Sequence, residues 1–156
     1  MTIHVAESRT VAVPLEAAYD RTLAVPLTDI FGHRHLAMPS IVRVDDQRGE
    51  WGEAVGQTRT IRTSDRGSLT ETLTELARPH RFGYRIDQIR GPMRPLVHHL
   101  DGAWAFAEDG SGTRITWSWE ITPSSTLTVP LVALIGRMWH GYARQALASL
   151  DAILTG

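Results

Sequence analysis

The sequence contains no cysteine and no lysine, and each absence excludes a kind of chemistry. Without cysteine the chain has no disulfide, no thiolate nucleophile and no zinc site with cysteine ligands. Without lysine it forms no Schiff base and has no P-loop, in which a lysine contacts the phosphates of a nucleotide. The motifs typical of serine hydrolases and Rossmann dehydrogenases are also missing, so hydrolase, dehydrogenase and NTPase activities have no support.

Long apolar runs and an excess of one charge are lacking as well. The most apolar stretch, residues 127–139, is interrupted by Pro130, Gly136 and Arg137 and falls short of the ~20 residues that span a bilayer. The first seven residues do not resemble a signal peptide. The formal net charge of −1 predicts no basic surface for nucleic acid or anionic membrane. We therefore expect a cytoplasmic protein without nucleic-acid partners or membrane insertion, either a monomer or a homodimer.

The first part of the chain predicts a strand and two short helices. A length of 156 residues suits a single domain, which we place over residues 1–156. Residues 3–13 are rich in β-branched side chains and predict a strand. A proline then opens a helix over residues 15–24, the next proline ends it, and residues 27–31 form one further turn. A short strand is expected at residues 41–44.

A first hairpin is predicted from two strands, residues 57–63 and 69–76, around the sequence Ser-Asp-Arg-Gly at residues 64–67. With this glycine in the left-handed position, the turn pairs residue 64 with residue 68. Alternate residues then share the inward face: Arg59, Ile61, Leu69, Glu71 and Leu73. In this register Arg59 and Glu71 lie diagonally across neighbouring strands, roughly 7 Å apart at the backbone.

A second hairpin is indicated by the sequence Asp-Gly-Ser-Gly at residues 109–112, flanked by aromatic and aliphatic residues that alternate with small or polar ones. The first glycine suits the leading central position of a type II′ turn. The register that follows pairs apolar side chains across the hairpin: Phe106 with Ile115, and Trp104 with Trp117. Turn chemistry and hydrophobic pattern therefore agree.

One more strand and a long helix complete the predicted elements. Residues 82–86 place Phe82, Tyr84 and Ile86 on one face of a strand. Residues 126–154 predict a helix with a proline in its first turn. Apolar residues recur along it at helical spacing: Leu131, Leu134, Ile135, Met138, Trp139, Tyr142, Ala146, Leu150 and Ile153.

These elements predict an α+β fold. A curled, seven-stranded antiparallel sheet with an aromatic inner face wraps around the long C-terminal helix. The two short helices follow the first strand, and a cavity is expected between the sheet and the long helix.

The strand motifs carry a family resemblance. GQTR at residues 56–59, ETLTE at 71–75, FGYRI at 82–86, GAWAF at 102–106 and GTRITW at 112–117 resemble the START and polyketide cyclase/dehydrase (SRPBCC) superfamily. The resemblance covers essentially the whole chain and implies the helix-grip fold with a deep cavity. Members use that cavity for lipid and sterol carriage, polyketide cyclisation, hormone binding and chaperone regulation, so the fold does not select among these functions.

The predicted cavity lining is largely apolar and aromatic. A flat or aliphatic hydrocarbon ligand would suit such a lining, and ordinary core packing is the alternative for each side chain. The expected ligand-contacting residues are Arg59, Ile61, Glu71, Leu73, Tyr84, His98, Trp104, Phe106, Trp117, Trp119, Met138, Trp139 and Tyr142.

Three of these residues are candidates for catalysis: Arg59, Glu71 and His98. A charge on the inward face needs a partner, so Arg59 and Glu71 form either a structural ion pair or a polar anchor for a ligand; a one-residue error in the register would instead expose both. In the second case Arg59 grips a ligand oxygen and Glu71 orients it or moves a proton. Strand parity with Trp104 predicts that His98 also points inward, as a core residue or as a base.

Two loops have weaker signals. His33 and His35 form a His-x-His pattern, but no third ligand stands at a recognisable spacing, and we predict neither a metal nor another cofactor. Residues 90–95 contain two prolines and a glycine, and they form either a gate at the cavity mouth or a rigid surface connection.

Three functions follow from this sequence. The first is an intracellular binding module for a small apolar or amphipathic molecule, such as a lipid, a polyketide or an aromatic metabolite. The second is a cyclase or dehydratase in which Arg59 polarises a carbonyl and Glu71 or His98 moves a proton. The third is an interaction protein whose cavity is residual. The binding module is preferred, because no acid–base pair stands at the spacing that catalysis needs.

Overall fold

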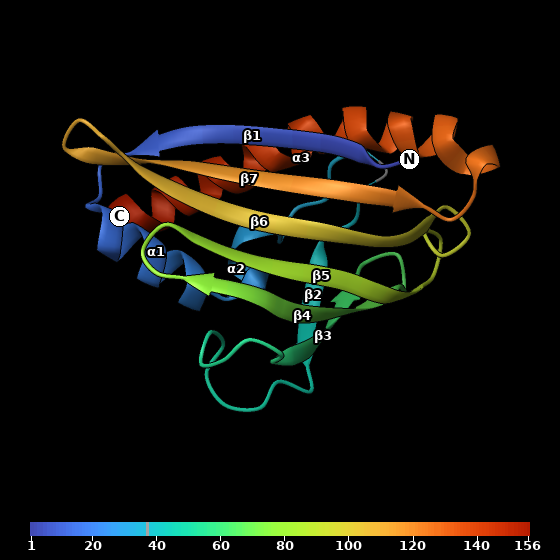
Figure 1. Ribbon diagram of the computed structural model, residues 1–156, viewed down its shortest axis with the longest axis horizontal. Coiled ribbons are helices and arrows are strands. Elements are labelled where there is room, and N and C mark those ends of the chain that lie inside the picture. The colour runs from blue at the N-terminus through green and yellow to red at the C-terminus, as the bar shows by residue number, and fades with distance from the viewer. Residues whose placement is uncertain (37) are drawn as a thin grey trace.

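The computed structural model describes residues 1–36 and 38–156. Figure 1 shows a curled sheet with α3 lying along one side of it and α1 and α2 behind it. In chain order the elements are β1 (Ile3–Val11), α1 (Leu15–Ala24), α2 (Leu27–Ile30), β2 (Ile41–Asp45), β3 (Thr58–Thr63), β4 (Ser68–Ala77), β5 (Arg81–Arg90), β6 (Val97–Asp109), β7 (Gly112–Pro123) and α3 (Val129–Thr155), with a single 3-10 turn (Thr126–Thr128) before α3.

The seven strands form one antiparallel sheet in the order β1-β7-β6-β5-β4-β3-β2. Every connection except the one from β1 to β2 joins sheet neighbours. Between β1 and β2 the chain passes through α1 and α2 and crosses to the opposite edge of the sheet. The predicted helix-grip fold is therefore confirmed, including the two short helices after the first strand.

The second hairpin has the predicted register. Phe106 lies opposite Ile115, Trp104 lies opposite Trp117, and Asp109 pairs with Gly112. Gly110 has a φ of 60°, as the leading central position of a type II′ turn requires.

The predicted register of the first hairpin is wrong by one residue on each strand. The backbone N–H of Thr63 donates to Gly67 O at 3.0 Å, so the loop has three residues and Arg66, with a φ of 66°, takes the left-handed position. The Asp65 carboxylate stabilises this loop by accepting hydrogen bonds from Thr63 Oγ1 and Gly67 N. Because both strands shift together, the inward face is unchanged, but Arg59 lies directly opposite Glu71 rather than diagonal to it.

The buried face of α3 also differs from the predicted stripe. Leu131 and Leu134 are each 52% exposed, and Met138 is half-buried. The reason is that α3 docks against β1: a Cβ atom on Gly136 would lie 3.4 Å from side-chain atoms of Ile3 and Val5. This approach buries Val132 and Gly136 beside five residues of the predicted stripe: Ile135, Trp139, Tyr142, Ala146 and Leu150.

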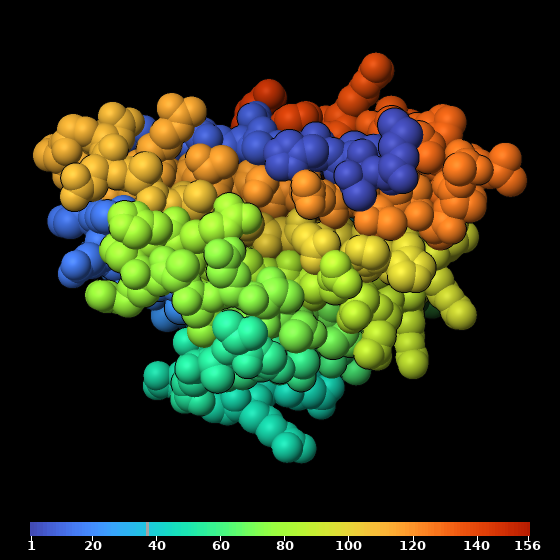
Figure 2. All heavy atoms as spheres, viewed as in Figure 1, coloured from blue at the N-terminus to red at the C-terminus, as the bar shows by residue number. Residues whose placement is uncertain are grey.

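The outer face of the sheet is polar. Figure 2 shows it as a continuous surface below β1, with the loop of residues 46–57 projecting from it. Exposed ion pairs bridge neighbouring strands on this face, such as Arg85 with Asp101 at 2.8 Å and Arg81 with Glu75 at 2.7 Å. None of the helices within the described residues is long and apolar enough to cross a membrane.

Candidate functional site

A cavity of about 130 Å³ lies between the inner face of the sheet and the three helices. Side chains from β2 to β7 form one side of it, and α1, α2, α3 and several loop residues contribute the rest. Its wall is apolar and aromatic apart from a few polar groups: Arg59, Glu71, Thr22, Thr63 and the hydroxyls of Tyr84 and Tyr142.

Many of the residues predicted to contact a ligand line this cavity. They are Arg59, Ile61, Glu71, Tyr84, Trp104, Trp117, Trp119 and Tyr142. Their place in the wall is a structural observation, whereas contact with a ligand remains a prediction.

Other predicted residues are buried behind the wall. Phe106 packs under α1, with its ring 5.4 Å from that of Tyr19. Trp139 lies behind the other indoles, 4.9 Å from Trp117 and 5.7 Å from Trp119. Leu73 is buried and Met138 is half-buried, and neither lines the cavity.

The expectation that His98 faces inward is wrong. The pairing of β6 with β7 shifts by one residue between Val97 and His99, so Val97 takes the inward place and lines the cavity. His98 is exposed on the other side, where its Nδ1 lies 2.7 Å from Nδ1 of His99. Strand parity could not reveal this β-bulge, because an extra residue reverses the alternation. His98 therefore has no route to a reaction in the cavity.

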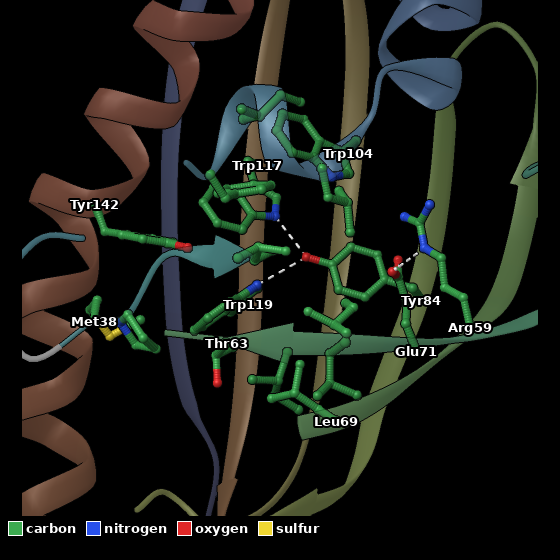
Figure 3. A pocket seen from close by; sticks show the side chains of 18 of the residues that line it. Met38, Arg59, Thr63, Leu69, Glu71, Tyr84, Trp104, Trp117, Trp119 and Tyr142 are labelled. Atoms are coloured by element: carbon green, nitrogen blue, oxygen red, sulfur yellow. Dashed lines mark hydrogen bonds and ion pairs between the residues drawn. The ribbon is translucent and has the colours of Figure 1, made fainter. Parts of the chain in front are cut away.

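Arg59 and Glu71 form a buried ion pair at one end of the cavity (Figure 3). Arg59 Nε donates to Glu71 Oε1 at 2.8 Å, and the two residues are 7% and 4% exposed. Burial raises the pKa of the Glu71 carboxyl, and the neighbouring guanidinium opposes that shift. Within the described chain, no further hydrogen bond from the Arg59 guanidinium is found. Its terminal nitrogens thus have no hydrogen-bond partner among the described residues.

Tyr84 stands in the middle of the aromatic wall. Its hydroxyl oxygen accepts two hydrogen bonds, one from Trp117 Nε1 at 2.8 Å and one from Trp119 Nε1 at 3.0 Å. Figure 3 shows these two bonds meeting at the tip of the ring, inside the cavity. Both indole donors are satisfied in this way, as buried polar groups require. The neighbouring strands β5, β6 and β7 hold this group rigidly, because their registers are continuous around it.

Comparison with known proteins identifies the family of the chain. The family described as "Polyketide cyclase / dehydrase and lipid transport" matches residues 2–155. The chain belongs to this family. None of the curated proteins matches the chain by sequence.

Solved structures share the fold of this polyketide cyclase/dehydrase family member at low identity. Ara h 8.0201 has a TM-score of 0.73 and 11% identity, and the match covers 99% of both chains. Major latex-like protein 151 from Panax ginseng has a TM-score of 0.73 and 12% identity, again over 99% of both chains. The di-domain ARO/CYC BexL of the BE-7585A biosynthetic pathway has a TM-score of 0.66 and 16% identity, over 97% of this chain and 49% of BexL. At these identities the likeness concerns the fold alone.

The polyketide cyclase/dehydrase fold thus supports a ligand-binding helix-grip protein. The predicted contact residues lack three of the cavity's aromatic residues. Phe82 was assigned to the inner face of a strand but not to the site, whereas Phe31 and Trp51 were missed because both stand outside regular strands and the long helix. Phe31 stacks on Tyr142 with ring centroids 5.6 Å apart. Trp51 covers the Arg59 guanidinium at 3.8 Å from the ring centroid, which is a cation–π contact. The sequence signal that could have pointed to Trp51 is a bulky indole between a glutamate and a glycine in a loop.

The loop that bears Trp51 is held in place by Gln57. The Gln57 side chain donates to the carbonyl oxygens of Arg48 and Glu50 and accepts from the N–H groups of Gly52 and Glu53. These four hydrogen bonds fix the loop and so position the indole over Arg59.

The segment at residues 90–95 lies close to the cavity, as its Met93 side chain lines it. Arg94 N donates to Gly91 O at 3.1 Å, and Leu96 N donates to Met93 O at 3.0 Å, so the segment is folded into consecutive turns. Gly91 packs against the Gly67 backbone of the β3–β4 hairpin, where a Cβ atom would meet Gly67 Cα at 2.8 Å. Whether this contact opens to admit a ligand stays a prediction.

No group of three or more histidine, aspartate or glutamate side chains that could hold a metal ion occurs among residues 1–36 and 38–156. His35 instead lies against α3, where Gln145 Nε2 is 3.4 Å from its Nδ1.

Gly102→Ala is expected to displace Tyr84 and to lower the free energy of unfolding by about 1–3 kcal/mol, as overpacking does. The Tyr84 ring lies across Gly102, and a Cβ atom there would overlap its Cζ. Urea denaturation followed by circular dichroism measures the loss. Gly83→Ala in the adjacent strand is the matched control: its Cβ would meet Thr74 Oγ1 at 3.3 Å, so a smaller loss is expected. Equal losses for the two variants would contradict the packing of Tyr84 over Gly102.

Proposed function

We propose that residues 1–156 act as a single ligand-binding domain that holds a small, uncharged, largely apolar molecule in the cavity between the sheet and α3. The observation that carries this proposal is the aromatic cavity of about 130 Å³. Its lining residues come from strands β2 to β7 and from all three helices, so the cavity belongs to the fold and not to one loop.

The volume selects among the ligand classes that the family suggests. An apolar cavity of about 150 Å³ binds one benzene molecule, and drug-sized ligands occupy about 300–1,000 Å³. A cavity of about 130 Å³ therefore suits one aromatic ring with small substituents. A lipid or a full polyketide chain requires side chains to move outward first. Among lipid, polyketide and aromatic metabolite, the last is supported best.

The charge balance of the cavity also supports an uncharged ligand. Arg59 and Glu71 neutralise each other across 2.8 Å, and the other lining side chains carry no charge. An ion that entered without a partner would lose its hydration in a medium of low dielectric constant, at a large cost in free energy. Neutral molecules are favoured for this reason.

Binding of α-methylstyrene, a single-ring hydrocarbon, tests the proposal. The probe is expected to quench the tryptophan fluorescence of the protein in a saturable manner, because Trp104, Trp117 and Trp119 line the cavity. At a free concentration of about 100 times its dissociation constant it should stabilise the fold by about 2.7 kcal/mol, visible as a rise in Tm.

Ile61→Phe is expected to abolish this binding, because the added ring occupies the cavity beside the buried Ile61 side chain. Leu131→Phe makes the same kind of change on the exposed side of α3 and should leave binding unchanged. Equal affinity of the probe for both variants, or no saturable binding by the wild type, would count against the cavity as the binding site.

A second candidate function is an enzyme of the cyclase or dehydratase type. The observation that favours it is the position of Glu71, since a carboxyl whose pKa is raised by burial is suited to hold a proton and release it to a substrate. Arg59 lies beside Glu71, since its Nε donates to the Glu71 carboxylate. The guanidinium can therefore polarise a carbonyl of the substrate that Glu71 protonates. His98, the other sequence candidate for the proton transfer, is excluded by its exposed position.

A further inference from the structure

The Tyr84 hydroxyl has a proton with no acceptor among the residues that the structure describes. A phenol oxygen offers one O–H donor and two lone pairs, and both lone pairs of Tyr84 take indole N–H groups. No acceptor for the Tyr84 O–H is found within residues 1–36 and 38–156. The two indoles thus orient the phenol so that its own hydrogen points away from them, into the cavity.

Two more hydroxyls in the cavity wall are unmatched. Tyr142, on α3, has its ring stacked on Phe31, and in the described chain its hydroxyl makes no hydrogen bond. Figure 3 shows that this hydroxyl faces the interior from the side opposite Tyr84. Thr22, on α1, is 6% exposed and lines the cavity, and its Oγ1 has no hydrogen-bond partner within the described residues. Buried polar groups are normally satisfied, so these unmatched hydroxyls indicate an acceptor that the described part of the chain does not supply.

Both phenols remain protonated at ordinary pH. Burial raises the pKa of Tyr84 and of Tyr142, because a phenolate would lose its hydration there. Nearby Glu71 raises the pKa of Tyr84 further. The two phenols are therefore hydrogen-bond donors without a positive charge, which suits a neutral acceptor oxygen better than a carboxylate.

We propose that Tyr84 is a specificity-determining residue that donates a hydrogen bond to the carbonyl oxygen of a compact, uncharged aromatic ligand, with Tyr142 as a second donor. This inference rests on the proposed binding function and names the ligand class for the same cavity. The two indoles act as positioning residues, since they reach the ligand only through the Tyr84 oxygen.

A matched pair of probes isolates this hydrogen bond. Acetophenone and α-methylstyrene have nearly the same shape, but acetophenone carries a carbonyl oxygen where α-methylstyrene carries a CH₂ group. Tyr84→Phe is expected to lower the affinity for acetophenone about tenfold, the effect of one neutral hydrogen bond, and to change that for α-methylstyrene by less than about twofold. Isothermal titration calorimetry measures the affinities for both probes.

Tyr19→Phe is the control variant. Tyr19 is buried against Phe82 and Phe106 outside the cavity, so the same loss of a hydroxyl should leave both affinities unchanged. If Tyr84→Phe fails to fold because two indole N–H groups lose their acceptor, Tyr142→Phe replaces it. The Tyr142 hydroxyl has no partner to lose in the described chain, and its removal should weaken the binding of acetophenone but not that of α-methylstyrene.

The outcomes separate the two proposals. Equal losses for the two probes, or none, would overturn the donor role of Tyr84, while saturable binding of α-methylstyrene would still support the cavity. Tighter binding of benzoate than of acetophenone would overturn the choice of a neutral carbonyl ligand. If neither neutral probe binds the wild-type protein, the binding function and the inference built on it both fail.

Discussion

Glu71→Leu alone is expected to lower the free energy of unfolding by about 3–5 kcal/mol, because it leaves the Arg59 guanidinium charged and buried without its partner. Arg59→Met alone is expected to have a similar effect, since it strands the buried carboxylate. Equilibrium unfolding in urea measures both losses, and an unchanged m-value would show that the denatured state is unaffected.

The double variant Arg59→Met, Glu71→Leu is expected to restore the wild-type stability or to exceed it by about 1–4 kcal/mol. The reason is that two apolar side chains of similar volume avoid the desolvation cost that the ion pair carries. The thioether introduced at position 59 can also pack on the Trp51 indole, whose present contact is the Arg59 guanidinium at 3.8 Å.

Arg85→Met, Asp101→Leu is the control for this double variant. It removes an ion pair of the same length from the exposed face of the sheet, where such pairs contribute little, so only a small change in stability is expected. A double variant at the buried pair that stays as unstable as its single variants would refute the account given for Arg59 and Glu71.

The double variant also separates a carrier from an enzyme. Native mass spectrometry can compare it with the wild type after both are purified from the natural host. In a carrier, the variant loses the molecule that the wild type retains. In an enzyme, the variant still binds the substrate but leaves it unconverted. If neither preparation carries a molecule and the two differ in stability alone, the cavity is residual and the ion pair serves the fold.

Trp117→Ala is the second variant with a large expected effect, a loss of about 3–5 kcal/mol in the free energy of unfolding. Trp117 is 2% exposed, and its ring lies between those of Trp104, Trp139 and Phe31 at centroid distances of 5.2, 4.9 and 5.1 Å. Its removal leaves a void among rigid rings, which cannot close around it, and deprives the Tyr84 oxygen of one donor.

Trp119→Ala is the matched comparison for Trp117→Ala. It removes the same type of residue from the same strand and the same kind of hydrogen bond to Tyr84, but Trp119 is only partly buried. A smaller loss is therefore expected. Urea denaturation curves for both variants provide the test, and equal midpoints would show that Trp117 is not the centre of the aromatic cluster.

Local chemistry in the sequence predicted much of the sheet. The alternation around Trp104 and Trp117, together with the Gly110 turn, predicted a hairpin register that the structure confirms. Alternation in the first hairpin likewise placed Arg59 and Glu71 on the inward face, where they form their ion pair. These predictions succeeded because side-chain direction in a strand has a period of two residues and needs no knowledge of distant contacts.

The structure decided the features that depend on two segments at once. The β-bulge at Val97 turns His98 to the surface, and it exists only in the pairing of β6 with β7. The rotation of α3 that exposes Leu131 follows from its docking on β1. One face of a sheet and one stripe of a helix can be found from the sequence alone. How closely the two approach, which hydroxyls are left unmatched and how much space remains between them depend on packing in three dimensions, and that packing gives the cavity its size and its donors.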